Sequence, residues 1–140
     1  MSNAKALADL QGMAKKLELL AELPETAAPL CADAIFARTA LTIERGTTPY
    51  GEPWKLVQTG PRKGQKALVN SLRKVFVTFK GPVISIRVRG IEGRHNYGGV
   101  AGRVKRQIVP GKRGLPRAMS EAITAVLVAE FNRTMESDPA

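Results

Sequence analysis

The sequence predicts an α+β fold, a small antiparallel β-sheet packed against N-terminal helices and a C-terminal helix, with a long basic glycine-rich loop. Two observations support this class. The hydrophobic pattern has a helical period at both ends of the chain and a two-residue period in the middle. Segment 93–116 holds six glycines and six arginines or lysines, a composition typical of a loop. With 140 residues, 44% of them apolar, the chain is expected to form a single domain, 1–140.

The N-terminal part, residues 1–45, is expected to be helical. Leucines and alanines recur at helical spacing over 4–22, and Pro24 ends that pattern. A second helix is predicted for 28–45, closed by Gly46. The two segments form either an αα-hairpin or a single bent helix. The apolar stripe of the second helix comprises Leu30, Ala34, Ala37 and Leu41.

Prolines and glycines predict a loop over 46–64, and the only tryptophan of the chain, Trp54, lies in its middle. We expect Trp54 to pack on the sheet or the C-terminal helix and to anchor this loop. An exposed position at an interface is the alternative for Trp54.

Segment 65–113 is expected to hold a short helix, a β-hairpin, an extended basic loop and a further strand. The helix is predicted for 65–73, and two β-rich runs, 74–80 and 83–89, flank a turn. Alternation places Val75, Val77 and Phe79 on the core face of the first strand and Ile84, Ile86 and Val88 on that of the second.

A third strand, 103–109, is predicted as an edge strand or as the stem of the loop, because its charges fall on both faces. The chain then returns to a helical pattern over 114–135, with Pro116 at the first helical position. The apolar stripe of this helix comprises Met119, Ile123, Val126, Leu127 and Phe131.

The net charge of +10 is concentrated in the middle of the chain. Residues 55–117 carry sixteen lysines or arginines and one acid, Glu92, whereas the remaining residues carry six bases and eleven acids. A basic surface attracts nucleic acid, an anionic membrane or an acidic protein, and charge alone does not choose among them. The longest apolar run is too short to cross a membrane, and the charged N-terminal segment argues against a signal peptide.

The sequence offers little for catalysis, metal binding or a cofactor, and we expect none of the three. One histidine, His95, and one cysteine, Cys31, cannot supply the four ligands of a structural zinc site. His95 has few acidic neighbours that would make it a general base, and Cys31 lies where a buried thiol is expected. The glycines of 93–116 match neither phosphate-binding pattern, since a β-rich segment follows them instead of a helix.

A small basic nucleic-acid-binding protein remains the alternative function. The arginines and lysines of 103–117 are closely spaced and could contact successive phosphates. Tyr97 is the only aromatic residue that interleaves with the basic residues of this part of the chain, so few rings are available for base stacking. No helix-turn-helix, zinc-finger or RNA-recognition signature is present.

Four short motifs in a fixed order are more specific than composition. They are "YGEPWKLV" around Trp54, "ALVNSL" in the predicted short helix, "HNYGG" at the start of the basic loop, and "IVPGKRGLP" before the last helix. In that order, over roughly 28–135, they resemble the phage virion morphogenesis (Mu-type) family and related neck and tail-completion proteins. The matching residues are Gly51, Pro53, Trp54, Leu56, Leu68, Ser71, Leu72, His95, Tyr97, Gly98, Ile108, Pro110, Arg113, Leu115 and Pro116. Tyr50 replaces an acidic residue of the family pattern, Asn70 replaces a glycine, and the third motif has a changed order.

The resemblance implies a structural virion protein without enzymatic activity, a head–tail connector, neck, tail-completion or tail-terminator subunit. Such subunits form a homo-oligomeric ring between portal and tail, with a hexamer favoured over a dodecamer. The implied partners are further copies of the chain, portal or adaptor and tail proteins, and non-specific contact with packaged DNA, but no membrane. The implied location is the head–tail interface of the virion, after synthesis in the host cytoplasm.

The basic glycine-rich segment is then predicted to be the assembly loop. The residues expected at the subunit or partner interface are His95, Tyr97, Arg103, Lys105, Arg106, Lys112 and Arg113. The glycines and like charges predict that 93–116 is mobile in the free protein and orders on assembly. Replacing Arg103, Lys105 and Arg106 together is therefore expected to impair assembly and to leave folding nearly intact.

Overall fold

The computed structural model describes residues 3–58, 60–68, 71–90, 96 and 106–136. Over these residues the fold is α+β, as predicted. The described chain forms three α-helices, one 3-10 helix and a two-stranded antiparallel sheet. In chain order they are α1 (Asn3–Ala21), α2 (Leu23–Arg45), η1 (Ser71–Lys74), β1 (Val75–Lys80), β2 (Val83–Val88) and α4 (Arg117–Glu136).

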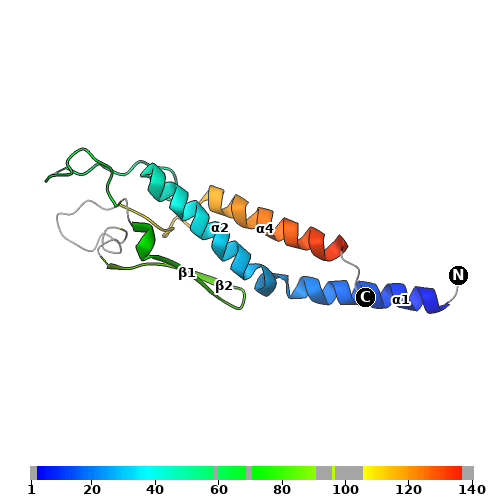
Figure 1. The fold of residues 1–140 in the computed structure, drawn as a ribbon. Helices are drawn as coiled ribbons and strands as arrows, with labels where there is room; N and C mark the ends of the chain where they lie inside the picture. Colours follow the sequence, from blue (N-terminus) through cyan, green and yellow to red (C-terminus); the bar gives the residue numbers. More distant parts are fainter. Residues whose placement is uncertain (1–2, 59, 69–70, 91–95, 97–105, 137–140) are drawn as a thin grey trace.

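Helix α2 is the central element of the fold. Helix α4 runs antiparallel along one side of α2, and the sheet lies on another side (Figure 1). Small side chains on α2, among them Ala27, Ala28 and Ala32, are buried. Such small residues let neighbouring elements approach the α2 backbone closely.

Helices α1 and α2 follow one another as a single bent helix, the second of the two predicted arrangements (Figure 1). The Glu22 amide donates to the Glu18 carbonyl at 3.2 Å, and the Thr26 amide donates to the Glu22 carbonyl at 3.0 Å. Helical hydrogen bonding thus continues on both sides of Pro24, which has no amide hydrogen to donate. Helix α2 therefore begins earlier than the sequence predicts.

Helix α2 ends at Gly46, as predicted. Gly46 has a φ of 70°, and its amide donates to the Ile43 carbonyl at 3.0 Å. The Thr47 amide donates to the Thr42 carbonyl, also at 3.0 Å. This left-handed residue with paired backward bonds is a Schellman-type helix end, and it directs the chain into the turn that precedes Trp54.

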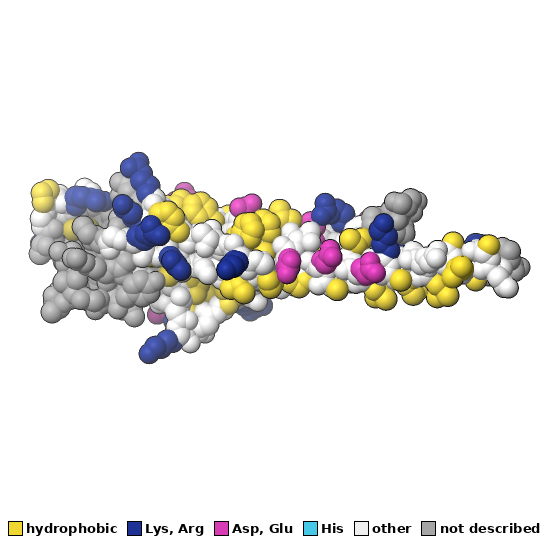
Figure 2. All heavy atoms as spheres, turned by 90° about the horizontal axis from the view of Figure 1, so that it is seen from below, with side chains coloured by type: hydrophobic (Ala, Val, Ile, Leu, Met, Phe, Trp, Pro, Cys, Tyr) yellow, Lys and Arg dark blue, Asp and Glu magenta, His cyan; other side chains and the backbone are white. Residues whose placement is uncertain are grey.

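Helix α1 projects beyond the rest of the molecule as an arm (Figures 1 and 2). It contains no buried residue among those described. The end of α4 lies against it, where Lys16 Nζ donates to the Met135 carbonyl at 2.7 Å. The apolar residues of the arm are therefore left largely uncovered.

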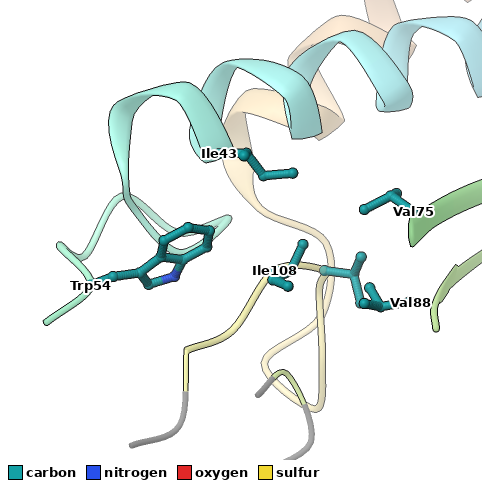
Figure 3. Packing of buried hydrophobic residues seen from close by; sticks show 6 residues of the cluster. Ile43, Trp54, Val75, Val88 and Ile108 are labelled. Atoms are coloured by element: carbon teal, nitrogen blue, oxygen red, sulfur yellow. The ribbon is translucent and has the colours of Figure 1, made fainter. Parts of the chain in front are cut away.

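The hydrophobic core lies between the C-terminal half of α2, the sheet and the segment that precedes α4 (Figure 3). Ile108 is fully buried and lies at its centre, with Val109 beside it. The other buried members of the cluster are Ile43, Trp54, Val75 and Val88.

The two predicted strands are confirmed, and their register is Val75↔Val88 at the open end and Lys80↔Val83 at the turn. Val75 and Val88 are buried, and Val77 and Ile86 pack against the same cluster. Burial declines toward the turn, where Phe79 is 52% exposed. The predicted alternation is correct, but the core covers only the part of the sheet next to η1.

The predicted stripe of α2 is wrong. Leu30 is 43% exposed and Ala37 is exposed, whereas Cys31, Ile35 and Thr39 are buried. Apolar residues occur on most sides of this helix, so periodicity alone did not identify the side that α4 and the sheet cover.

Two further elements differ from the prediction. The helix predicted for 65–73 is reduced to the 3-10 turn η1, and Leu68 has a φ of 56°, which no residue of a right-handed helix adopts. In the predicted third strand, the described residues 106–109 form no strand. The amides of Ile108 and Val109 donate to the side chain of Asn96 and are therefore not available to a neighbouring strand.

Candidate functional site

Asn96 joins the basic segment to the core. Its side chain is 4% exposed, and its Oδ1 accepts hydrogen bonds from the Ile108 amide at 2.6 Å and the Val109 amide at 2.9 Å. Because one oxygen satisfies two neighbouring buried amides, Asn96 replaces the partner that a strand would have supplied. Residues 97–105, between Asn96 and the described segment that begins at Arg106, lie outside the described residues.

Arg106 is a buried arginine, only 7% exposed. Its Nε donates to the Lys55 carbonyl at 2.9 Å, and its Nη2 donates to the Leu56 carbonyl at 3.3 Å. Its guanidinium thus joins the return of the basic segment to the loop that carries Trp54. This geometry places Arg106 inside the fold and argues against the expectation that Arg106 can be replaced without affecting folding.

Trp54 lies on the other side of the same junction. Its ring is 8% exposed and packs in the core cluster with Ile43 and Ile108, and its Nε1 donates to the Gln107 carbonyl at 2.8 Å (Figure 3). Trp54 therefore donates a hydrogen bond from segment 54–56 to segment 106–107, and Arg106 donates hydrogen bonds in the reverse direction. This paired attachment fixes the loop after α2 to the residues that follow the basic segment.

Tyr50 organises the second half of the junction. Its hydroxyl donates to the Gly114 carbonyl at 2.6 Å and accepts a hydrogen bond from the Gly111 amide at 3.2 Å. The guanidinium of Arg113 lies 4.1 Å from the centre of the Tyr50 ring and forms an ion pair with Glu52. Arg113 remains 62% exposed and Lys112 is exposed, so both present charge to solvent.

The remaining predicted interface residues, His95, Tyr97, Arg103 and Lys105, lie outside the described residues. The structure therefore brings Trp54 and Arg106 together at the core, whereas Arg113 and Lys112 lie at the surface. Lysines and arginines gather toward this end of the molecule, opposite the α1 arm (Figure 2).

The arm itself carries an apolar surface. Leu7, Leu10 and Leu17 are 57%, 63% and 61% exposed, and Met13 is 61% exposed. Large apolar side chains that share one helix face and lie uncovered are typical of a protein-binding surface.

Helix α4 carries a second apolar surface on its outer side. A shallow hollow of about 600 Å³ is lined there by Ala125, Val128 and Ala129, among others. Val128 is 51% exposed, and Phe131, one turn further, is 44% exposed. The alanines leave room between the larger side chains, so this hollow fits the ridge of another helix.

Metal-dependent and thiol chemistry have little support among the described residues. No group of three histidine, cysteine, aspartate or glutamate side chains lies close enough to hold a metal ion in the described chain. Burial raises the pKa of the Cys31 thiol, which disfavours the reactive thiolate. No helix among the described residues has the length and apolarity needed to span a membrane.

Sequence reasoning missed Asn96 and the inward direction of Arg106. A polar residue inside a glycine-rich segment gives no periodic signal, and an arginine in a basic run is expected at the surface. The sequence predicted the apolar stripe of α1, but it did not predict that this stripe would be left exposed.

No family model, curated protein or solved structure matches this chain. The resemblance to phage neck and tail-completion proteins thus stays a prediction from the four motifs.

Proposed function

We propose that the chain is a structural subunit of a phage virion, a head–tail connector or tail-completion protein that assembles with copies of itself into a ring. The order of the four motifs supports the class. The uncovered apolar face of α1 supports self-assembly, because isolated amphipathic helices rarely project into solvent without a partner.

The second copy of the chain offers a fitting surface for the arm. Leu7, Leu10 and Leu17 form a ridge on α1, and Ala125 with Ala129 borders a hollow on the outer side of α4. Helices α1 and α4 have 19 and 20 residues, so both are about 30 Å long. The exposed leucines of one subunit can therefore lie along the hollow of the next.

A contact between α1 of one copy and α4 of another is heterologous, because it joins two different surfaces. Contacts of this kind close into rings when the rotation between subunits allows it. A ring agrees with the six-fold assembly that the motif resemblance implies. Pairing of two α1 arms with each other would instead be isologous and would end at a dimer.

In this proposal the long basic glycine-rich loop is the contact to further partners. Its two ends are held by Asn96 and Arg106, so the fold presents its charged residues from a fixed base. The lysines and arginines of the loop then meet acidic faces of portal or tail proteins, or the packaged DNA. Self-assembly would thus use the α1 arm and α4, and contact with further partners would use the basic end of the subunit.

The test is the mass and shape of the purified protein, with Leu10→Lys compared with Gln11→Lys. Both substitutions add a lysine to the same turn of α1, but only Leu10 belongs to the apolar face. We expect rings by electron microscopy and a multiple of the 15.1 kDa chain mass for wild type and Gln11→Lys. Leu10→Lys should be monomeric. A wild-type protein that is monomeric at every concentration would refute self-assembly through α1.

Cysteine cross-linking distinguishes the two geometries. In a Cys31→Ser background, a chain carrying both Leu10→Cys and Val128→Cys should give a ladder of disulfide-linked oligomers. Leu10→Cys alone should give none. Efficient dimerisation of Leu10→Cys alone would establish the isologous pairing and would exclude the ring.

A second candidate function, a small basic nucleic-acid-binding protein, is favoured by the gathering of lysines and arginines at one end of the molecule (Figure 2). Tight, salt-dependent binding of duplex or single-stranded nucleic acid by a monomeric chain would favour this function over ring assembly.

A further inference from the structure

Four arginines line one hollow at the end of the molecule away from the α1 arm. The hollow has a volume of about 680 Å³ and lies between the last turns of α2, the turn before Trp54 and the first turn of α4. The lining arginines are Arg38, Arg45, Arg113 and Arg117, and the one acid among the lining residues is Glu121. Such an excess of guanidinium groups in one concave site creates a strongly positive potential.

The guanidinium groups of this hollow are only partly neutralised within the chain. The Nε of Arg38 is buried and has no hydrogen-bond partner among the described residues. Arg113 pairs with Glu52, and Arg117 Nε donates to Glu121 Oε1 at 2.8 Å. Both pairs are more than 60% exposed, so water screens them and an incoming anion can compete for either arginine.

The start of α4 adds to the positive potential. Arg117 and Ala118, the first two residues of this 20-residue helix, line the hollow, and the first turn contains no acidic side chain. The positive end of the helix dipole therefore faces the hollow. The negative end of α2 also lies nearby, but two carbonyls of its last turn, those of Thr42 and Ile43, accept hydrogen bonds from the amides of Thr47 and Gly46.

We propose that this hollow binds a phosphate group. Phosphate carries more oxygen acceptors than a carboxylate, so it can bond to several guanidinium groups at once. Arg38, the exposed Arg45 and the start of α4 all line the same volume. A single carboxylate would leave most of these donors unused.

The phosphate can come from a free phosphate or nucleotide, or from the backbone of a nucleic acid. The guanidinium of Arg113 already covers a face of the Tyr50 ring, so that face is not open to a stacked base. Recognition therefore rests on the phosphate group. The site goes beyond the proposed ring assembly, and the monomeric Leu10→Lys variant should retain it.

The binding of inorganic phosphate, measured by calorimetry at constant ionic strength, tests the proposal. Arg45→Gln and Arg117→Gln should each weaken phosphate binding by about tenfold or more, because each removes hydrogen bonds to a charged ligand. Arg87→Gln, which removes the same charge from the exposed side of β2, should change the affinity little. Equal weakening by all three variants would reduce the site to non-specific attraction and would overturn the proposal.

Removing Glu121, the acid that competes for Arg117, should change the phosphate affinity in the opposite direction. Glu121→Gln frees Arg117 and should strengthen phosphate binding, whereas Glu18→Gln on the α1 arm removes the same charge far from the hollow and should not. An equal effect of both variants would contradict a local site.

Two further ligands identify the source. If an oligonucleotide without terminal phosphates binds, and Arg45→Gln weakens that binding, the ligand is the nucleic-acid backbone. Binding of phosphate and pyrophosphate without binding of the oligonucleotide indicates a free phosphate or a nucleotide. If acetate binds as tightly as phosphate, or if neither phosphate nor the oligonucleotide binds, the proposal is wrong.

Discussion

Replacing Trp54 separates the two interactions through which it holds the loop after α2. The ring is 8% exposed, so nearly its whole apolar surface contributes to the core, and its Nε1 donates to the Gln107 carbonyl at 2.8 Å. Trp54→Phe keeps an aromatic ring but leaves that carbonyl without its donor, which should lower the free energy of unfolding by about 1–3 kcal/mol. Trp54→Ala also opens a cavity and should lower it by about 3–5 kcal/mol.

Urea unfolding followed by far-ultraviolet circular dichroism measures these losses. Fluorescence does not serve, because Trp54 is the only tryptophan and both variants remove it. At roughly 4 °C per kcal/mol for a chain of this size, Trp54→Ala should lower Tm by about 10–20 °C. Phe79→Ala is the matched control, since Phe79 is 52% exposed and its loss should cost about 1 kcal/mol or less.

The order of the three variants is the decisive result. The reasoning requires Trp54→Ala to be the least stable, Trp54→Phe to be intermediate and Phe79→Ala to be close to wild type. Unchanged stability of Trp54→Ala together with lost assembly would show that Trp54 belongs to an interface, and the core packing described above would then not be its main role.

Two other predictions follow from buried groups. Arg106→Gln should lower the free energy of unfolding by about 2–4 kcal/mol, because Arg106 donates two charge-assisted bonds, whereas Lys112→Gln at the surface should leave it unchanged. Trp54 fluorescence in urea measures both, and equal stability of the two variants would disprove the role of Arg106. The Cys31 thiol, whose pKa is raised by burial, should react with a disulfide reagent at neutral pH only after unfolding. The pKa of the Cys31 thiol is higher in the folded than in the unfolded protein. Its contribution to stability is therefore full below the unfolded pKa and is lost as pH rises through the folded pKa. In urea titrations at increasing alkaline pH, the free energy of unfolding should fall more for wild type than for Cys31→Ala. Rapid reaction of the native protein would contradict this.

The parts of the fold that were predicted correctly depend on local chemistry. Two runs rich in β-branched and aromatic residues on either side of a turn predicted both strands, and Gly46 predicted the end of α2. Pro24 marked the bend between the first two helices, although a helix can continue beyond a proline in its first turn. These signals lie in the residues themselves and need no knowledge of distant contacts.

The parts that were missed depend on contacts between distant residues. Arg106 is buried because the carbonyls of Lys55 and Leu56, some fifty positions earlier, accept its hydrogen bonds. The third strand is absent from 106–109 because Asn96 takes the amides that a strand would use. Neither effect changes the local hydrophobic pattern, so periodicity could not reveal it.

Glu121 links the two proposed surfaces. It borders the arginine hollow, where it pairs with Arg117, and it also lines the hollow on α4 that would receive the α1 arm of the next subunit. The arm carries three lysines and two acids (Lys5, Lys15, Lys16, Asp9 and Glu18), so an arm seated on α4 adds a net positive charge to the neighbourhood of Glu121. Any pairing of Glu121 with that charge frees Arg117 and raises the affinity for phosphate. By linkage, bound phosphate would then raise the affinity of α4 for the arm by the same factor. The assembled wild type should therefore bind phosphate more tightly than monomeric Leu10→Lys, and this difference should disappear in Glu121→Gln. A difference that persists without Glu121 would mean that assembly affects the arginine hollow by another route.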